Sequence, residues 1–205
     1  MNEFWKFKRS YWDYYLELEI QFMETKRFVE FDKINSKAYS LEYLKLYQAV
    51  CSEIDVVGKE IAMTVHPNAQ IDEKATIKKW GYEVQQKFPS LKDELVEFNN
   101  LFTVQPFKNW EYEKYVSVDK HGNKRNGLRI KEGRKTLAWW NNYNAIKHRR
   151  IGLLAGERNY QLANQSNLIL ALAALFLLEF LYMENVLESD EQLSEESKLF
   201  KYIKK

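Results

Sequence analysis

The sequence has few of the residues that interrupt helices or build metal sites. Its 205 residues include only seven glycines, three prolines, three histidines and one cysteine. Few glycines and prolines favour long helices with few tight turns. The single cysteine, Cys51, excludes an internal disulfide and a cysteine-based zinc site, and we interpret it as a small apolar core residue. The histidines have no metal-ligand spacing, so we expect no metal and no cofactor.

Other signals of location and chemistry are missing as well. The chain has no P-loop, GxGxxG or GxSxG motif, so nucleotide hydrolysis and α/β-hydrolase chemistry have no support. The first ten residues contain no apolar run, so we expect no signal peptide and a cytoplasmic protein. Residues 168–183 are almost wholly apolar, but 16 residues fall short of the ~20 that span a membrane. We expect no membrane span. The run should be a helix buried in a bundle or between subunits, with a partner for Glu179.

The helical pattern predicts an all-α fold in one domain, 1–205. Ser40 should cap a long amphipathic helix that ends at His66-Pro67. We also expect a hairpin near 104–130 within an insertion at 104–133, and an acidic linker with a short last helix in 188–205. The other expected helices cover residues 10–24, part of 71–88, 91–99 after Ser90, 134–149, 159–187 and, at the end of the chain, 197–204.

Positive charge is concentrated in the centre of the chain. Residues 120–158 contain eleven lysines and arginines and two acids, which gives 11 − 2 = +9, although the whole chain carries only +2. A basic segment in an otherwise acidic chain is typical of a surface that binds a polyanion. The ordinary alternative is a solvated helix and loop surface.

The most informative segment is Trp139-Trp-Asn-Asn-Tyr-Asn-Ala-Ile-Lys-His-Arg-Arg150. On a helix, Asn144, Lys147 and His148 share one face, and two arginines follow within a turn. An imidazole can move protons near neutral pH, and guanidinium groups hold phosphate oxygens. The alternative is a helix C-terminus at which cations complement the helix dipole.

The Asn144-x3-His148 pattern resembles the HEPN superfamily. Those proteins are α-helical bundles, many of them metal-independent ribonucleases of toxin–antitoxin and phage-defence systems. Their motif is an arginine, four to six residues and a histidine, often with an asparagine after the arginine. Here Tyr143 stands in the arginine position, which is a departure that bears on catalysis. The resemblance also matches the polar helix around Glu53, Asp55, Lys59 and Glu60 to the family's helix that faces the motif; the alternative is an ordinary solvated helix face.

The resemblance implies an RNA-targeting protein that works as a homodimer, in which two copies of the single motif histidine would supply the paired acid and base. His148, Asn144, Lys147 and Tyr143 would form the catalytic site. The residues expected to bind RNA are Arg149, Arg150, Arg134, Lys135 and Arg158. Two alternatives stay open: a non-catalytic module that binds RNA or a protein partner such as an antitoxin, and a structural dimer in which Trp139, Trp140 and Tyr143 only fix helix packing.

Overall fold

The computed structural model of the chain describes residues 2–187, 193 and 195–204. It corrects the all-α prediction. The fold is mixed α/β, 54% helical and 16% strand, with seven strands in three small antiparallel sheets. Most of these strands are two to four residues long, and such short segments leave too little alternation to be distinguished from helix or loop by sequence pattern.

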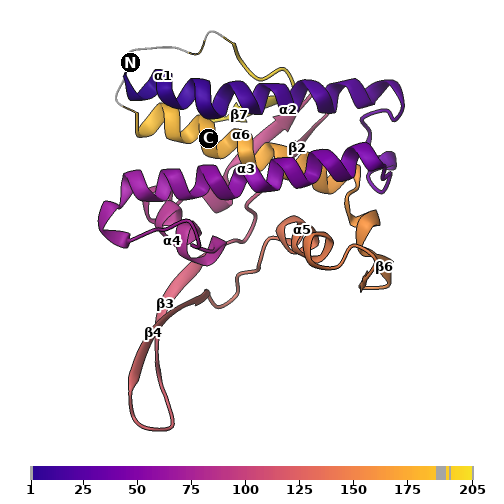
Figure 1. Ribbon diagram of the computed structural model, residues 1–205. Helices are drawn as coiled ribbons and strands as arrows, with labels where there is room; N and C mark the ends of the chain where they lie inside the picture. Colours follow the sequence, from indigo (N-terminus) through magenta and orange to yellow (C-terminus); the bar gives the residue numbers. More distant parts are fainter. Residues whose placement is uncertain (1, 188–192, 194, 205) are drawn as a thin grey trace.

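A long N-terminal helical run lies on one side of the molecule (Figure 1). It consists of α1 (Glu3–Phe7), a π-helical turn (Lys8–Trp12) and α2 (Asp13–Glu24). The helix predicted for residues 10–24 is therefore confirmed and begins earlier. The buried side chains of this run are mainly aromatic and lie on one face, which packs against the centre of the molecule: Phe4, Phe7, Trp12, Tyr15 and Phe22.

The amphipathic helix is confirmed as α3 (Leu41–Val65). The Ser40 hydroxyl accepts a hydrogen bond from the Tyr43 backbone N–H at 3.0 Å, which makes it the N-cap, and Pro67 follows the last turn. The predicted apolar stripe is buried from Leu44 to Ile61, whereas Leu41 at the first position is exposed. The next helix, α4 (Ile77–Lys87), packs against α3. It begins later than the predicted segment because residues 70–76 form a loop.

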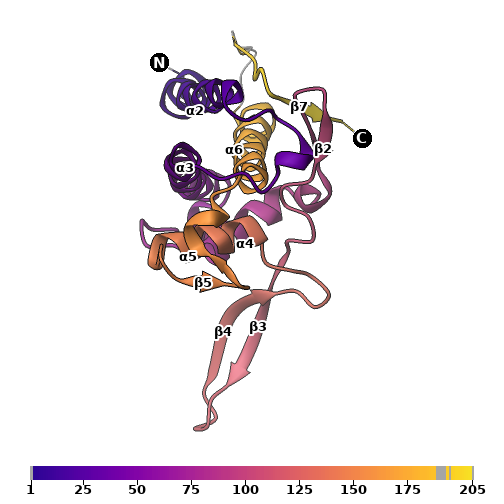
Figure 2. The ribbon, with the colours of Figure 1, turned by 90° about the vertical axis from the view of Figure 1, so that its right-hand side faces the viewer.

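The apolar run forms α6 (Gln165–Asn185), which is the core helix of the molecule. It contacts α2, α3, α5, β1 and β7, and Figure 2 shows it between the helical layers and the small sheet. The helix has 21 residues, so it is long and apolar enough to cross a membrane, and its length alone does not exclude a span. However, 78% of its most apolar window is buried inside the protein, as in the core helix of a globular fold. Residues 159–162, predicted as its beginning, form a separate 3-10 turn.

Glu179 of α6 differs from its predicted environment. Its side chain is completely buried, and neither carboxylate oxygen has a hydrogen-bond partner in the described part of the chain. Burial raises the pKa of this carboxyl well above its ordinary value, and the nearby Glu53 raises it further. The partner that we expected for Glu179 is thus absent from the described residues.

Two predicted helices are strands instead. Residues 95–98 form β1 (Leu95–Phe98), and the end of the chain forms β7 (Phe200–Ile203), which pairs with β1 so that Val96 lies opposite Tyr202. The third strand is β2 (Phe102–Val104). The Glu19 carboxylate accepts hydrogen bonds from the backbone N–H groups of Lys198 and Leu199, so this segment is held in extended form against α2. Most of the acidic stretch at 188–194 lies outside the described residues.

The predicted hairpin is present as β3 (Tyr112–Val118) and β4 (Lys124–Ile130), which we call the arm. Both views show it projecting from the body of the molecule beyond α4 and α5 (Figures 1 and 2). The arm pairs with no other strand among the described residues. At its base, the Gln85 side chain of α4 accepts a hydrogen bond from the Tyr112 N–H at 2.9 Å and donates one to the Trp110 carbonyl. After the arm come α5 (Ala138–His148) and the short strands β5 (Leu153–Leu154) and β6 (Glu157–Arg158).

Candidate functional site

Aromatic side chains fix α5 in the core. Trp139, Trp140, Tyr143 and Ile146 are buried on one face of the helix. The Trp139 indole N–H donates to the Pro106 carbonyl at 2.8 Å. The Tyr47 hydroxyl of α3 donates a hydrogen bond to the Trp139 carbonyl. These aromatics therefore have the packing role that we considered, and they fix the position of α5 against the core.

The structure brings the predicted motif residues together at one cleft. Asn144, Lys147 and His148 line it with Trp140 and Tyr143, and its volume is about 550 Å³. Lys147 and His148 are exposed, and Asn144 is half-buried. Within the described residues, the side chains of Asn144 and His148 form no hydrogen bond. The face predicted from helical spacing is thus available to a ligand.

Tyr143 has a different environment from its neighbours in the motif. Its ring is buried against Tyr47 in an edge-to-face contact, and the Lys147 ammonium lies 5.6 Å from the ring centroid. Burial raises the pKa of the Tyr143 hydroxyl, and the Asp55 carboxylate adds to this shift. Tyr143 therefore forms part of the cleft wall as a neutral group and cannot supply the positive charge of an arginine.

The opposite wall of the cleft comes from α3 and the loop before α4. Ser52, Asp55 and Lys59 line it from α3. Asp55 pairs with Lys59 at 2.6 Å and accepts a hydrogen bond from the Trp80 indole at 2.9 Å. Lys59 also donates to the Glu73 carbonyl at 2.8 Å. This pair is therefore fixed and close to neutral, and the loop adds Lys74, an exposed lysine without an ion pair in the described part of the structure.

A buried asparagine fixes the end of α5. The Asn159 side-chain amide donates to the carbonyls of Ala145 and Arg149, at 3.0 and 2.6 Å, and so caps the last turn. Asn159 can lie this close to the end of α5 because residue 152 is glycine. A Cβ at position 152 would lie 2.8 Å from the Asn159 amide nitrogen. Sequence reasoning missed Asn159, since no local pattern links a residue beyond a loop to the preceding helix end.

Arg149 and Arg150 follow this cap and are exposed. Arg150 makes one long hydrogen bond, 3.4 Å, to the Gln48 side chain, and neither arginine forms an ion pair among the described residues. Arg158, in β6, is exposed on the same loop. We call Lys147, His148, Arg149 and Arg150 the α5-end cluster. It combines one imidazole with three cations that have no carboxylate partner in the described structure.

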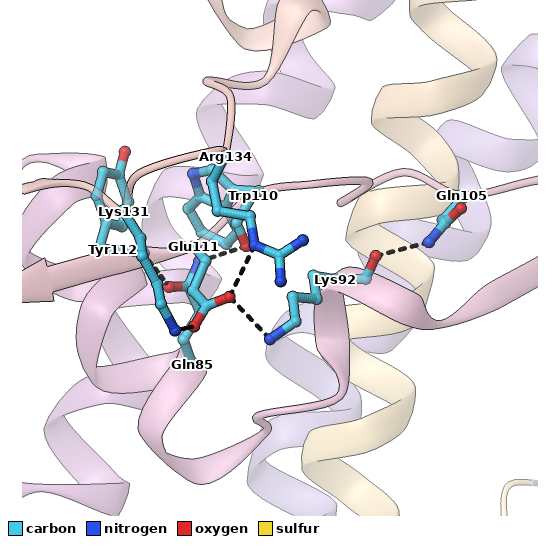
Figure 3. Close-up of polar contacts among 8 residues, drawn as sticks. All are labelled: Gln85, Lys92, Gln105, Trp110, Glu111, Tyr112, Lys131 and Arg134. Atoms are coloured by element: carbon cyan, nitrogen blue, oxygen red, sulfur yellow. Dashed lines mark hydrogen bonds and ion pairs between the residues drawn. The ribbon is translucent and has the colours of Figure 1, made fainter.

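Arg134 and Lys135 lie at the other end of α5. Eleven helical residues separate the two ends by about 16 Å, so these two side chains do not join the α5-end cluster. The Arg134 guanidinium contacts the Glu111 carboxylate at 3.1 Å, and Lys92 and Lys131 contact the same carboxylate at 2.8 and 2.7 Å (Figure 3). The hydrogen bonds from Lys131 and Lys92, together with their positive charges, lower the pKa of Glu111 to about 2. We call these four residues the Glu111 cluster.

The basic segment is therefore less positive than its sequence suggests. Four of its eleven cations pair with acids that lie just before residue 120, and those acids are Glu111, Glu113 and Asp119. The described residues contain no group of three or more His, Cys, Asp or Glu side chains arranged to hold a metal ion.

Comparison with protein-family models, curated proteins and solved structures found no match for this chain. The resemblance to HEPN proteins therefore stays a prediction that rests on the α5 motif.

Proposed function

We propose that the cleft binds RNA and that His148 transfers a proton in metal-independent cleavage of the RNA backbone, as in HEPN-like ribonucleases of phage defence or toxin–antitoxin systems. The observation that carries this proposal is the convergence of His148, Lys147 and Asn144 on one open cleft. Lys74 adds positive charge from the opposite wall. An exposed imidazole beside cations without carboxylate partners is suited to a phosphodiester.

The reaction would proceed within the RNA strand. The 2′-oxygen attacks the adjacent phosphorus while the bond to the 5′-oxygen breaks, which gives a cyclic phosphate and a free 5′-hydroxyl. His148 would take the proton of the 2′-hydroxyl or give one to the leaving 5′-oxygen. Lys147 would stabilise the negative charge that develops on the phosphoryl oxygens. Asn144 would orient the phosphate or the imidazole by hydrogen bonding.

A single imidazole per cleft favours an arrangement in which two copies share one site. The buried α6 cannot supply the dimer face that its apolar sequence suggested, because the chain itself covers that helix. We infer instead that a homodimer would form through Ile151, Leu153 and Leu154, exposed apolar residues just beyond the α5-end cluster. This position would bring two copies of His148 toward each other.

The second candidate is a non-catalytic protein that binds RNA through the same cleft. It is favoured by Tyr143, which is buried and neutral where the HEPN motif has an arginine. Both candidates share the cleft and its cations, and only the first needs the proton transfer by His148.

The test is cleavage of end-labelled total RNA by the purified protein in the presence of EDTA. The ribonuclease proposal predicts cleavage that falls by about 10²-fold or more in His148→Ala, while RNA binding changes little. His66→Ala is the matched control, because His66 Nδ1 lies 3.0 Å from the Glu83 carboxylate of α4 and His66 does not line the cleft. Binding without cleavage would leave the non-catalytic candidate. Absence of both binding and cleavage at low salt would exclude RNA as the ligand.

A further inference from the structure

The arm is shaped to meet a ligand outside the body of the protein. Each strand has seven residues, which corresponds to about 23 Å of extended chain. From Lys114 to Asn126 every residue is exposed except Asp119. The arm extends on the side of the molecule that carries α4 and α5, the helices that contribute to the cleft (Figures 1 and 2).

One face of the arm carries an aromatic ring between two arginines. The strand register places Tyr115 opposite Gly127, Ser117 opposite Arg125 and Glu113 opposite Arg129. The Tyr115 ring lies over Gly127, where a Cβ would come within 2.7 Å of the ring. The Arg129 guanidinium lies 5.6 Å from the ring centroid. Glycine at 127 therefore lets the ring lie flat on the strand, and 36% of Tyr115 remains exposed.

The arm carries an excess of positive charge, part of it unpaired and part of it in ion pairs that a phosphate could replace. Lys120 and Lys124 are exposed near the tip and form no ion pair in the described part of the chain. Arg125 pairs with Asp119 at 3.2 Å, and Arg129 pairs with Glu113 at 2.8 Å. Such exposed pairs contribute little to stability, so both guanidinium groups can contact phosphates without a large loss. An exposed ring beside such cations is the combination that binds unpaired bases and their backbone.

We propose that the arm binds single-stranded RNA, with Tyr115 stacking on a base and Arg125, Lys120 and Lys124 contacting phosphates. This inference rests on the proposed function of the cleft and names its substrate class. Single strands fit better than duplex RNA because a paired base has no free face for the ring, and the A-form major groove is too narrow for side chains to read. The arm would hold the strand beyond the cleft in which His148 acts.

The experiment measures the affinity of the full chain for fluorescein-labelled oligouridine by anisotropy at low salt. Tyr115→Ala should weaken binding about tenfold, because the base no longer has a ring on which to stack. Tyr115→Phe keeps the ring and should bind within about twofold of wild type. Phe28→Ala is the matched control and should bind like wild type, because Phe28 is also an exposed ring beside an arginine, Arg27 at 4.8 Å, but lies remote from the arm in the sequence and fold.

The outcomes separate this inference from the function on which it rests. If wild type binds oligouridine and Tyr115→Ala binds equally well, the arm is not the RNA site and the cleft proposal stands. A preference for duplex DNA or duplex RNA over oligouridine would also overturn the single-strand assignment. If wild type binds no RNA at all, the proposed function fails, and the inference about the arm fails with it. Melting temperatures of Tyr115→Phe and Phe28→Ala should equal that of wild type, and Tyr115→Ala should melt within about 4 °C of it, because it loses only one partly exposed cross-strand contact.

Discussion

The Glu111 cluster and the α5-end cluster both take cations from the basic segment 120–158, the first Lys131 and Arg134, but they have opposite electrostatic environments. In the Glu111 cluster, Lys92, Lys131 and Arg134 surround a single carboxylate. In the α5-end cluster, Lys147, Arg149 and Arg150 have no carboxylate partner among the described residues. The Glu111 cluster links the base of the arm to Lys92 before it and to Arg134 after it. The positive charge of the α5-end cluster is available to a ligand.

The difference shows that a charge count along the sequence does not locate a binding surface. Arg134 and Arg149 are equivalent by composition, yet only Arg149 lies beside His148 at the cleft end of α5. The carboxylate that pairs with Arg134 belongs to Glu111, which lies 23 residues earlier in the chain. Pairing in the fold, which the sequence does not display, decides which cations are available to bind a polyanion.

The largest effect on stability should follow from removal of the shared carboxylate. Glu111→Gln leaves three cations without a counter-charge and should lower the free energy of unfolding by about 1–3 kcal/mol near neutral pH, less than the full pKa shift implies because the cluster is partly solvated. The pKa of Glu111 is lowered from 4.5 to about 2, so its stabilisation is complete above pH 4.5 and is lost as the pH falls toward 2. Denaturant unfolding across this range measures the difference.

The same variant sharpens the comparison between the clusters. Because Glu111 does not line the cleft, Glu111→Gln should bind oligouridine like wild type. Equal stability of the variant and wild type at pH 7 would show that the cluster does not hold the arm base. A tenfold gain in RNA affinity would show that the freed cations belong to the binding surface.

A smaller effect is expected at Glu179, the carboxylate that has no cation. Glu179→Met replaces a buried unpartnered group with an apolar side chain of similar size and should stabilise the fold by about 1 kcal/mol at pH 7. Folding raises the pKa of Glu179. Wild-type stability is therefore undiminished by this group below the unfolded-state pKa of 4.5 and declines as the pH rises above that value. The melting temperature of wild type, measured relative to that of the variant, should therefore be lower at pH 8 than at pH 5. A variant with the same pH dependence as wild type would contradict this account.

Local signals located individual elements but not the mixed α/β fold class. The Ser40 cap and the amphipathic pattern located α3, and the hairpin expected near 104–130 is the arm. The small sheet was not predicted because β1 and β7 are about a hundred residues apart and neither has enough alternation to be read alone. Residues 197–204 suggested a helix, but pairing with β1 and the hydrogen bonds that the Lys198 and Leu199 N–H groups donate to the Glu19 carboxylate decide their conformation.

Local patterns also predicted only part of the candidate site. Helical spacing placed Asn144, Lys147 and His148 on one face, and the structure puts all three at one cleft. Arg134 was also expected to bind RNA with this group, although the length of α5 separates it from the cleft end of the helix. Of the polar residues expected on the facing helix, Asp55 and Lys59 line the cleft, whereas Glu53 is near Glu179 on another face of α3. Such assignments depend on helix packing that no local pattern contains.

The most direct test of the comparison is the salt dependence of RNA affinity. The measurement compares wild type with two variants that lose the same formal charge, Arg149→Ala with Arg150→Ala and Lys131→Ala with Arg134→Ala. For every RNA phosphate that a variant no longer neutralises, the slope of log affinity against log salt should become shallower by roughly 0.7. The first variant should therefore lose about 1.4, and the second should keep the wild-type slope. Equal loss in both variants, or loss only in the second, would contradict the claim that the α5-end cluster contacts RNA.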